Sequence, residues 1–453
     1  MKFLRWISWF NREKITFLIA SLALSLGAIS PWYRLPSEAL ETFEINLVLA
    51  NAGRICAALF AISGFVFTFL FSLNRLPRLP FWIGLIAALL FPYFITTWSP
   101  NVAFMSAAYY KQGVQVSKHV ERNFPKVQAQ WKQNITLSRS SPIKSISYFS
   151  IKDSRFFQMS SWDQILVEGF GYSNNFFAYI GRGWGFTITG FVLCLFALYV
   201  GLENQSFNTF ITDMGKLLPW VGLLIVILVF SMILPNIINY QLDTMLAKGQ
   251  YRQVLAASQT LESWYPPLQG DQEFLKRMAE AGFYGNEPDP ALIYFAKGLE
   301  RYRQQDFIGA EDYFRRSLAM QPKRFLVREY LATTILNQGV DYFNVPNSSN
   351  SHQPGAAADR FEHVLSIFPK HIEALYDLML ARVVNGEFEK SALAAQQIIQ
   401  TQKYPQQPNL ALLGQAYLHL AWDSYHNGDT EQAWKQYRQS IDEKTWKQSG
   451  EAQ

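Results

Sequence analysis

Residues 291–324 decide the fold of the second half of the chain, and they read ALIYFAKGLERYRQQDFIGAEDYFRRSLAMQPKR. Small residues stand where two antiparallel helices would cross, and large residues beside them fill the remaining space. A polar turn divides the stretch, and a proline ends it because proline cannot continue a helix. The stretch therefore predicts a helical hairpin. Its signature positions are Tyr294, Gly298, Asp306, Phe307, Ala310, Phe314, Ser317 and Pro322.

Further hairpins follow with a period near 34 residues and with decreasing fidelity. The second covers about 325–371 and contains an insertion at Val340–Gly355 that is rich in Asn, Ser and Pro. A third begins near Ile372, and a fourth completes the domain at residue 443. Their signature residues are Ala357, Phe361, Val364, Leu365 and Pro369 in the second, Gly386 in the third, and Gly428, Ala433, Tyr437 and Ser440 in the fourth.

These units resemble the tetratricopeptide repeat family over 291–443, with a short tail at 444–453. The resemblance implies an all-α solenoid whose stacked hairpins bury a continuous core. It also implies a protein partner, because this family holds peptide segments in the groove lined by the first helix of each unit. The alternative is that individual groove residues pack on adjacent repeats. The residues at groove positions are Phe295, Leu299, Tyr302, Arg303, Tyr376, Leu380, Val383, Trp422, Tyr425 and His426.

The segment 243–290 joins the two halves of the chain. Three of its residues have the spacing of a repeat: Gly249 at the turn, Tyr251 as the aromatic residue that follows it, and Pro266 at the end of the second helix. One interpretation is a degenerate repeat that begins inside the last membrane helix, which would hold the array at a fixed angle to the bilayer. The other is a short juxtamembrane helix that resembles a repeat by chance.

The first half of the chain contains five long uncharged stretches, and roughly 20 apolar residues are enough to cross a bilayer. We expect three spans within residues 1–100 and two within 183–242. Two alternatives are a set of buried soluble helices and a first segment that is cleaved as a signal peptide. The stretches lie between Lys14 and Arg34, Arg54 and Arg75, Arg78 and Lys111, Trp184 and Leu202, and Lys216 and Asp243.

The orientation follows from the basic residues in short segments, which stay on the cytoplasmic side. Lys2, Arg5, Arg12 and Lys14 precede the first span, and Arg75 and Arg78 lie in the tight turn between the second and the third. Five spans then place the C-terminal array outside the cytoplasm, in a membrane of the bacterial inner-membrane type. The loop at 101–182 falls on the same side despite ten Lys/Arg against four Asp/Glu, because long loops largely escape the rule.

That loop has a basic start, a Ser-rich middle and an aromatic later part. A docking platform, a lipid contact and a small folded cap are all compatible with it. Both cysteines, Cys56 and Cys194, fall within spans, so the soluble parts contain no thiol. A disulfide framework and a cysteine-based zinc site are therefore excluded there.

Catalytic motifs of the common hydrolase, nucleotide-binding and metalloprotease types are absent from the sequence. The nearest metal-like pattern is His419, Asp423 and His426, which can share one helical face. Chance placement on a repeat helix explains it better, so we expect no metal or cofactor. Nucleic-acid binding is not expected despite a pI of about 8.9, because the soluble domain has no basic stripe interleaved with aromatics.

Two functions of different classes fit these features. The favoured one is a membrane-anchored scaffold or adaptor without enzymatic activity that recruits or orients partner proteins in an envelope complex. The alternative is a membrane enzyme or transport accessory of cell-surface glycan assembly or export, since some polytopic glycan ligases end in such repeats. The predicted spans carry no internal acidic or basic residue, which favours the scaffold.

Overall fold

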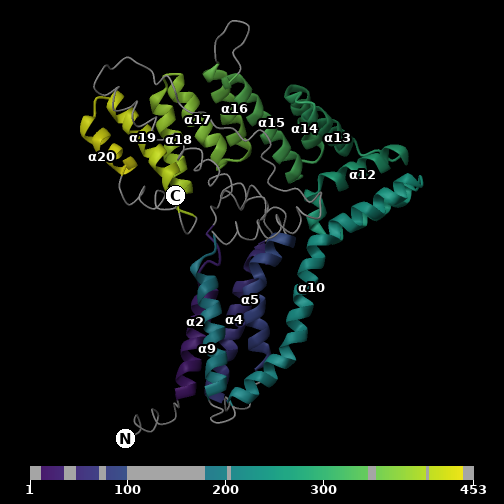
Figure 1. Ribbon diagram of the computed structural model, residues 1–453, viewed down its shortest axis with the longest axis vertical. Coiled ribbons are helices and arrows are strands. Elements are labelled where there is room, and N and C mark those ends of the chain that lie inside the picture. The colour runs from purple at the N-terminus through teal and green to yellow at the C-terminus, as the bar shows by residue number, and fades with distance from the viewer. Residues whose placement is uncertain are drawn as a thin grey trace.

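The computed structural model describes residues 12–34, 47–70, 78–98, 179–200, 206–344, 353–404 and 408–441. Among these residues the regular elements are helices, and one isolated β-bridge joins Tyr33 and Ile180. The predicted all-helical class is therefore confirmed for the described part of the chain. Figure 1 shows a narrow bundle at one end and a broad array of helices across the other. Nearly all of the predicted 101–182 loop and the whole 444–453 tail lie outside the described residues.

The bundle consists of α2 (Arg12–Ile29), α4 (Leu47–Leu70), α5 (Leu79–Trp98) and α9 (Arg182–Val200). Helix α2 packs mainly on α9 and α4, and α9 also contacts α5. Near the start of α4, Arg54 donates hydrogen bonds to the carbonyl oxygens of Ala28 (2.9 Å) and Ile29 (3.1 Å). These carbonyls end α2 and lack partners within the helix. The contact shows that α2 and α4 run antiparallel.

Small residues let the bundle helices approach one another closely. A Cβ on Gly27 would lie 2.2 Å from the Thr187 hydroxyl, and one on Gly64 would lie 2.2 Å from the Ser21 hydroxyl. Both hydroxyls bond backbone carbonyls within their own helices, Thr187 to Gly183 and Ser21 to Phe17. The interior of the bundle therefore accommodates polar groups between small residues.

Large apolar side chains lie on the outside of the same helices. On α2 and α4 they recur every three or four residues, so each of these two helices turns one apolar stripe outward. The exposed members are Ile15, Ile19, Leu22, Leu26 and Ile29 on α2, Ile55, Leu59, Ile62 and Val66 on α4, Leu79, Ile83 and Leu89 on α5, and Phe186, Val192 and Phe196 on α9.

The long helix α10 (Ser206–Ala247) connects the bundle to the array. It rises along the bundle and then bends outward at the level where the array begins (Figure 1). Pro235 lies inside the helix, and proline is a common cause of such bends because it removes a backbone hydrogen bond. We call residues 236–264, the end of α10 together with α11, the arm.

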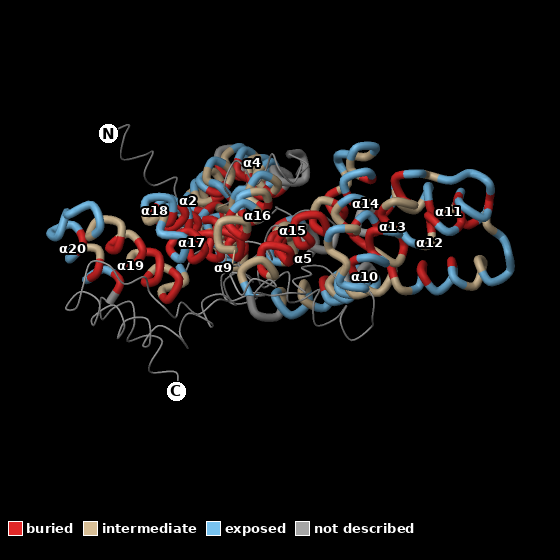
Figure 2. The backbone as a smooth tube through the Cα atoms, turned by 90° about the horizontal axis from the view of Figure 1, so that it is seen from above, coloured by how far each residue is buried: buried red, intermediate tan, exposed pale blue. Residues whose placement is uncertain are grey.

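The array continues from the arm as a series of packed helices, and its apolar core includes α10 residues from Ile238 onward and extends to Tyr437. Figure 2 shows buried residues along its whole length. Its elements are α11 (Tyr251–Trp264), η4 (Pro266–Gly270), α12 (Gln272–Tyr284), α13 (Pro290–Arg303), α14 (Phe307–Met320), α15 (Phe325–Asn344), α16 (Pro354–Ile367), α17 (Ile372–Val384), α18 (Phe388–Thr401), α19 (Leu410–His426) and α20 (Thr430–Ile441).

Glycines with positive φ angles mark three of the turns. Gly249 (φ 71°) follows α10, Gly386 (78°) follows α17, and Gly428 (84°) follows α19, at the positions where the sequence predicts turns. Glycine adopts this left-handed conformation without the steric penalty of a Cβ. The insertion predicted from Val340 begins later, because Val340 is fully buried and α15 continues to Asn344.

Two helical stretches in the described part of the chain are long and apolar enough to cross a membrane, judged by length and composition alone. These are Arg182–Tyr199 and Thr209–Ile227. The apolar stretches Lys14–Ile29, Gly53–Val66 and Leu79–Pro92 are shorter. The count of five spans therefore stays a prediction.

Candidate functional site

Most residues at the predicted groove positions are buried between helices. Seven of them have at most 5% of their surface exposed: Phe295, Leu299, Tyr302, Tyr376, Leu380, Val383 and Trp422. Arg303 and His426 are exposed, and Tyr425 is half-buried. Leu299 also lines the groove between α12 and α13 described below, whereas the other six are packed between helices. They match the alternative that the sequence leaves open, packing on adjacent repeats.

Ring contacts explain this burial. Tyr330 of α15 lies 5.8 Å from the Phe295 ring and 5.6 Å from the Tyr302 ring, in edge-to-face geometry. One aromatic of the following hairpin thus fills the space beside two aromatics of α13, and such pairs stabilise by about 1 kcal/mol beyond area burial. Contact between neighbouring hairpins therefore covers this face of α13.

The residues at signature positions hold each hairpin together. Ala310, Phe314, Phe361, Ala433 and Tyr437 are buried, and Tyr294 is half-buried and stacks on Tyr313. Gly298 faces the Phe314 ring, where a Cβ would lie 2.5 Å from a ring carbon. Gly339 meets the Phe361 ring at 2.6 Å in the next hairpin. Pro322 and Pro369 are exposed in the turns after α14 and α16.

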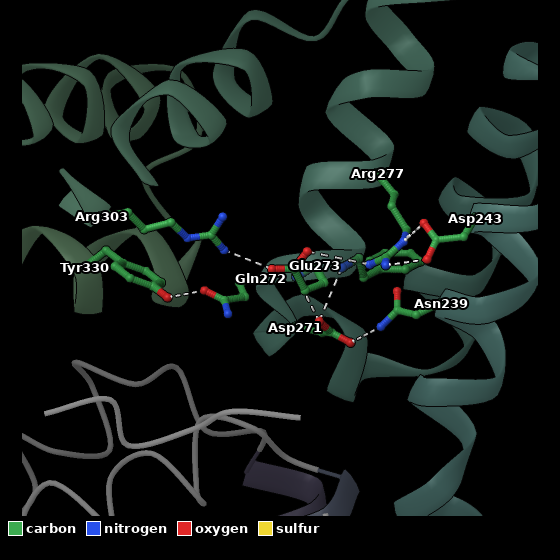
Figure 3. Close-up of polar contacts among 9 residues, drawn as sticks. Asn239, Asp243, Asp271, Gln272, Glu273, Arg277, Arg303 and Tyr330 are labelled. Carbon is green, nitrogen blue, oxygen red and sulfur yellow. Dashed lines mark hydrogen bonds and ion pairs between the residues drawn. The ribbon is translucent and has the colours of Figure 1, made fainter. Parts of the chain in front are cut away.

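A polar cluster connects α10 to the array, and we call it the joint (Figure 3). Its centre is the start of α12, where three consecutive residues contact three different helices. Asp271 accepts a hydrogen bond from Asn239 of α10 (2.6 Å), Gln272 accepts one from Tyr330 of α15, and Glu273 accepts one from Arg303 of α13 (3.0 Å). The first turn of α12 therefore fixes the end of α10 relative to two array helices.

Asp271 is the most buried acid of the joint, with 2% of its surface exposed. It caps α12 by accepting hydrogen bonds from the backbone N–H groups of Glu273 (3.0 Å) and Phe274 (3.2 Å). Burial disfavours the charged form and raises the pKa of Asp271 to about 6, against the lowering effect of these bonds, of Asn239 and of nearby Arg277. This carboxyl group therefore titrates close to neutral pH.

Arg277 adds an ion pair to the joint. Its guanidinium donates two hydrogen bonds to the Asp243 carboxylate, at 2.5 and 2.6 Å, in a bidentate arrangement. Bidentate pairs of this kind combine geometric specificity with a charge-assisted bond. Burial opposes the charge, but the bonds to Asp243 and the charges of Glu273 and Asp271 raise the pKa of Arg277. Asp243 and Asn239 lie one turn apart on α10, so the joint contacts two successive turns of this helix.

A groove of about 630 Å³ opens between α12 and α13 next to the joint. Its lining combines buried Ala279 and Leu299 with half-buried Ala296, and small residues on both helices create the depression. Exposed charges of both signs and the 60% exposed Phe283 surround this apolar strip. The charged lining residues are Lys276, Glu280, Lys297, Glu300 and Arg303. Of the predicted groove residues, the structure brings Leu299 and Arg303 together here.

The side chains of the metal-like pattern are engaged separately. His419 is buried and lies 2.9 Å from the Ser391 hydroxyl, and burial lowers its pKa to about 3. His426 stacks on Phe388 with ring centres 3.7 Å apart. Asp423 accepts a hydrogen bond from Asn427. Among the described residues no group of three or more metal-ligating side chains converges.

Sequence reasoning missed both the joint and the α12–α13 groove. The local signal for the joint was an aspartate just before an apolar helix, which is typical of an N-cap. Its partner Asn239 lies 32 residues away, so the pairing has no local signature. No protein-family model matches the chain, and no curated protein matches it significantly.

Proposed function

We propose that this protein is a membrane-anchored scaffold of the tetratricopeptide type, which binds a segment of a partner protein and holds it at a fixed orientation to the bilayer. The observation that carries the proposal is the inverted polarity of the bundle. Its exterior is lined by large apolar residues such as Ile19, Leu59 and Phe196, whereas hydroxyl groups lie inside. A water-exposed bundle has its polar face outside, and a lipid-exposed one buries small and polar groups between its helices.

Antiparallel helix directions support five spans with the array on the side opposite the N-terminus. Helix α2 begins at Arg12, and the N-terminal end of α2 lies at the end of the bundle away from the array (Figure 1). Arg78 and Lys216 lie near Asp213, which is close to the start of α10 at that same end. Cations gathered at this end suit the cytoplasmic side. The array is then extracytoplasmic.

Rigid attachment of the array supports a role in orienting a partner. The joint and the continuous apolar core leave no flexible linker between α10 and α13. The surface proposed to bind the partner is the α12–α13 groove, because it combines an apolar strip with charged neighbours that fix orientation. Apolar anchors with polar neighbours are typical of peptide-binding sites.

Site-specific photo-crosslinking in intact cells tests this function. A photoreactive residue replaces Lys297 in the groove or, as a matched control, Leu393, which is 54% exposed on α18. We expect a discrete adduct with another protein from position 297 only. The additional substitution Ala296→Trp fills the groove and should remove that adduct. Equal adducts from both positions, or an adduct that survives Ala296→Trp, would contradict partner binding in this groove.

A further inference from the structure

Apolar side chains are exposed on several faces of α10 beside the bundle, and one line of them continues past Pro235 into the arm. Val226 and Phe230 lie beside the bundle, and Ile237 and Tyr240 follow after Pro235. Their spacings of four, seven and three residues keep all four on one helical face. The exposed fractions are 62% for Val226, 52% for Phe230, 38% for Ile237 and 70% for Tyr240. The outward surface of the bundle therefore continues onto the arm.

The opposite face of the arm packs on the array. Ile238 and Leu242 are buried in the apolar core, and Asn239 is held by Asp271 at the start of α12. This packing fixes the rotation of the segment about its axis. Ile237 and Tyr240 consequently stay directed away from the array.

A second large aromatic side chain lies at the same level of the molecule. Trp264, the last residue of α11, is 81% exposed. The next residue, Tyr265, is buried, and the following element, η4, contacts α5 of the bundle. Trp264 therefore stands close to the plane where the bundle ends and the array begins.

We infer that the arm lies in the interface of the bilayer, with Tyr240 and Trp264 as anchors at the level of the lipid headgroups. The inference rests on the proposed membrane function and deepens it. Tyrosine and tryptophan favour this level because their rings are apolar on one side and carry a polar group on the other. Lys248 and Arg252, both exposed beside the turn at Gly249, add cations that attract anionic headgroups. Because this line of exposed apolar residues continues from the part of α10 beside the bundle, we infer that lipid covers it on the arm as well.

Depth-dependent fluorescence quenching tests the inference in the full-length protein. A Cys56→Ser background retains only Cys194, which is fully buried and should not react with a probe. Single cysteines are then introduced as Val226→Cys, Tyr240→Cys, Trp264→Cys and, at the far end of the array, Trp434→Cys, whose native residue is 52% exposed. Each variant is labelled with an environment-sensitive dye. The proteins are placed in vesicles that carry a nitroxide near the glycerol or near the acyl-chain end.

The expected pattern has three parts. The dye at 226 is quenched best by the deep nitroxide, those at 240 and 264 by the shallow nitroxide, and that at 434 by neither. If the dye at 226 is quenched but those at 240 and 264 are not, the arm does not lie in the interface. The proposed membrane function would still stand. Absence of quenching at all four positions overturns both. Protection of 240 and 264 from both nitroxides and from aqueous quencher would assign the surface to a protein instead of lipid.

Discussion

At the residue scale, Asp271 is a buried carboxylate that caps the start of α12. Its pKa of about 6 in the folded protein lies above the ordinary 3.8, so the folded state binds this proton more tightly than the unfolded chain does. Above pH 6 the buried charge therefore opposes folding. The opposition is relieved as the pH falls through 6 toward 4.

The substitution Asp271→Asn should remove this pH dependence. Asparagine retains the N-cap, which it forms about as well as aspartate, and introduces no buried charge. We expect the variant to match or exceed the wild type in stability at pH 7.5, by up to about 3 kcal/mol, and to lose its advantage by pH 4. Thermal unfolding of both proteins across this pH range checks the prediction. Subtracting the unfolding free energy of the wild type from that of the variant cancels the contributions of the other titrating groups. Parallel curves would contradict the assigned burial penalty.

Gly298 shows how one missing side chain sets the distance between two helices. The Phe314 ring lies where a Cβ would be, and Phe314 is completely buried and has little room to move. We expect Gly298→Ala to destabilise the array by about 1–3 kcal/mol through overpacking, despite the higher helix propensity of alanine. Chemical denaturation measures the loss.

Gly355→Ala is the matched control for this substitution. Gly355 lies at the start of α16, and its nearest neighbouring atom would be 3.7 Å from the new Cβ. This variant should be neutral or slightly more stable. Equal losses at both positions would show that close packing at Gly298 is not the cause.

At the element scale, the joint determines how α10 meets the array. Arg277→Gln removes the bidentate pair with Asp243 while retaining most of the side-chain length. We expect faster hydrogen exchange in α11 and α12 and a stability loss of about 1–2 kcal/mol. Arg316→Gln is the control, because its pair with Asp312 lies within one helix and both side chains are more than half exposed. That change should leave the stability and the hydrogen exchange nearly unchanged, because solvent screens exposed pairs. Unchanged exchange in the Arg277 variant would show that the pair does not hold the arm.

The array is held together by contacts between residues close in the sequence and by contacts between residues far apart in it. Asp289 and Asp306 cap their helices within three residues, so the sequence alone places these starts. Arg324 pairs with Glu262 at 2.8 Å across 62 residues and ties the α14–α15 turn to α11. Such a contact depends on how the hairpins stack, and no pattern of spacing indicates it.

At the scale of the whole molecule, topology is the decisive property. Five spans and a cytoplasmic N-terminus place the C-terminus outside the cytoplasm. An enzyme reporter that works only outside should therefore be active at the C-terminus, and a protein that fluoresces only in the cytoplasm should be dark there. The Lys/Arg residues at the end of the bundle away from the array provide the physical reason. The same reporters after residue 98, at the end of α5, should give the same side. A fluorescent C-terminal fusion would require a different number of spans.

Local patterns were enough to predict the helical class, the hairpin period and the turns at Gly386 and Gly428, because small residues and positive-φ glycines act over a few residues. Which faces of these helices remain open depends on how the helices pack in three dimensions. Phe295 and Tyr376 lie at positions typical of a binding groove, yet neighbouring helices bury them. The joint instead arises from residues far apart in the chain, and the α12–α13 groove depends on the angle at which two consecutive helices pack. Burial is a property of the assembled array, so the candidate binding surface could not be predicted from spacing alone.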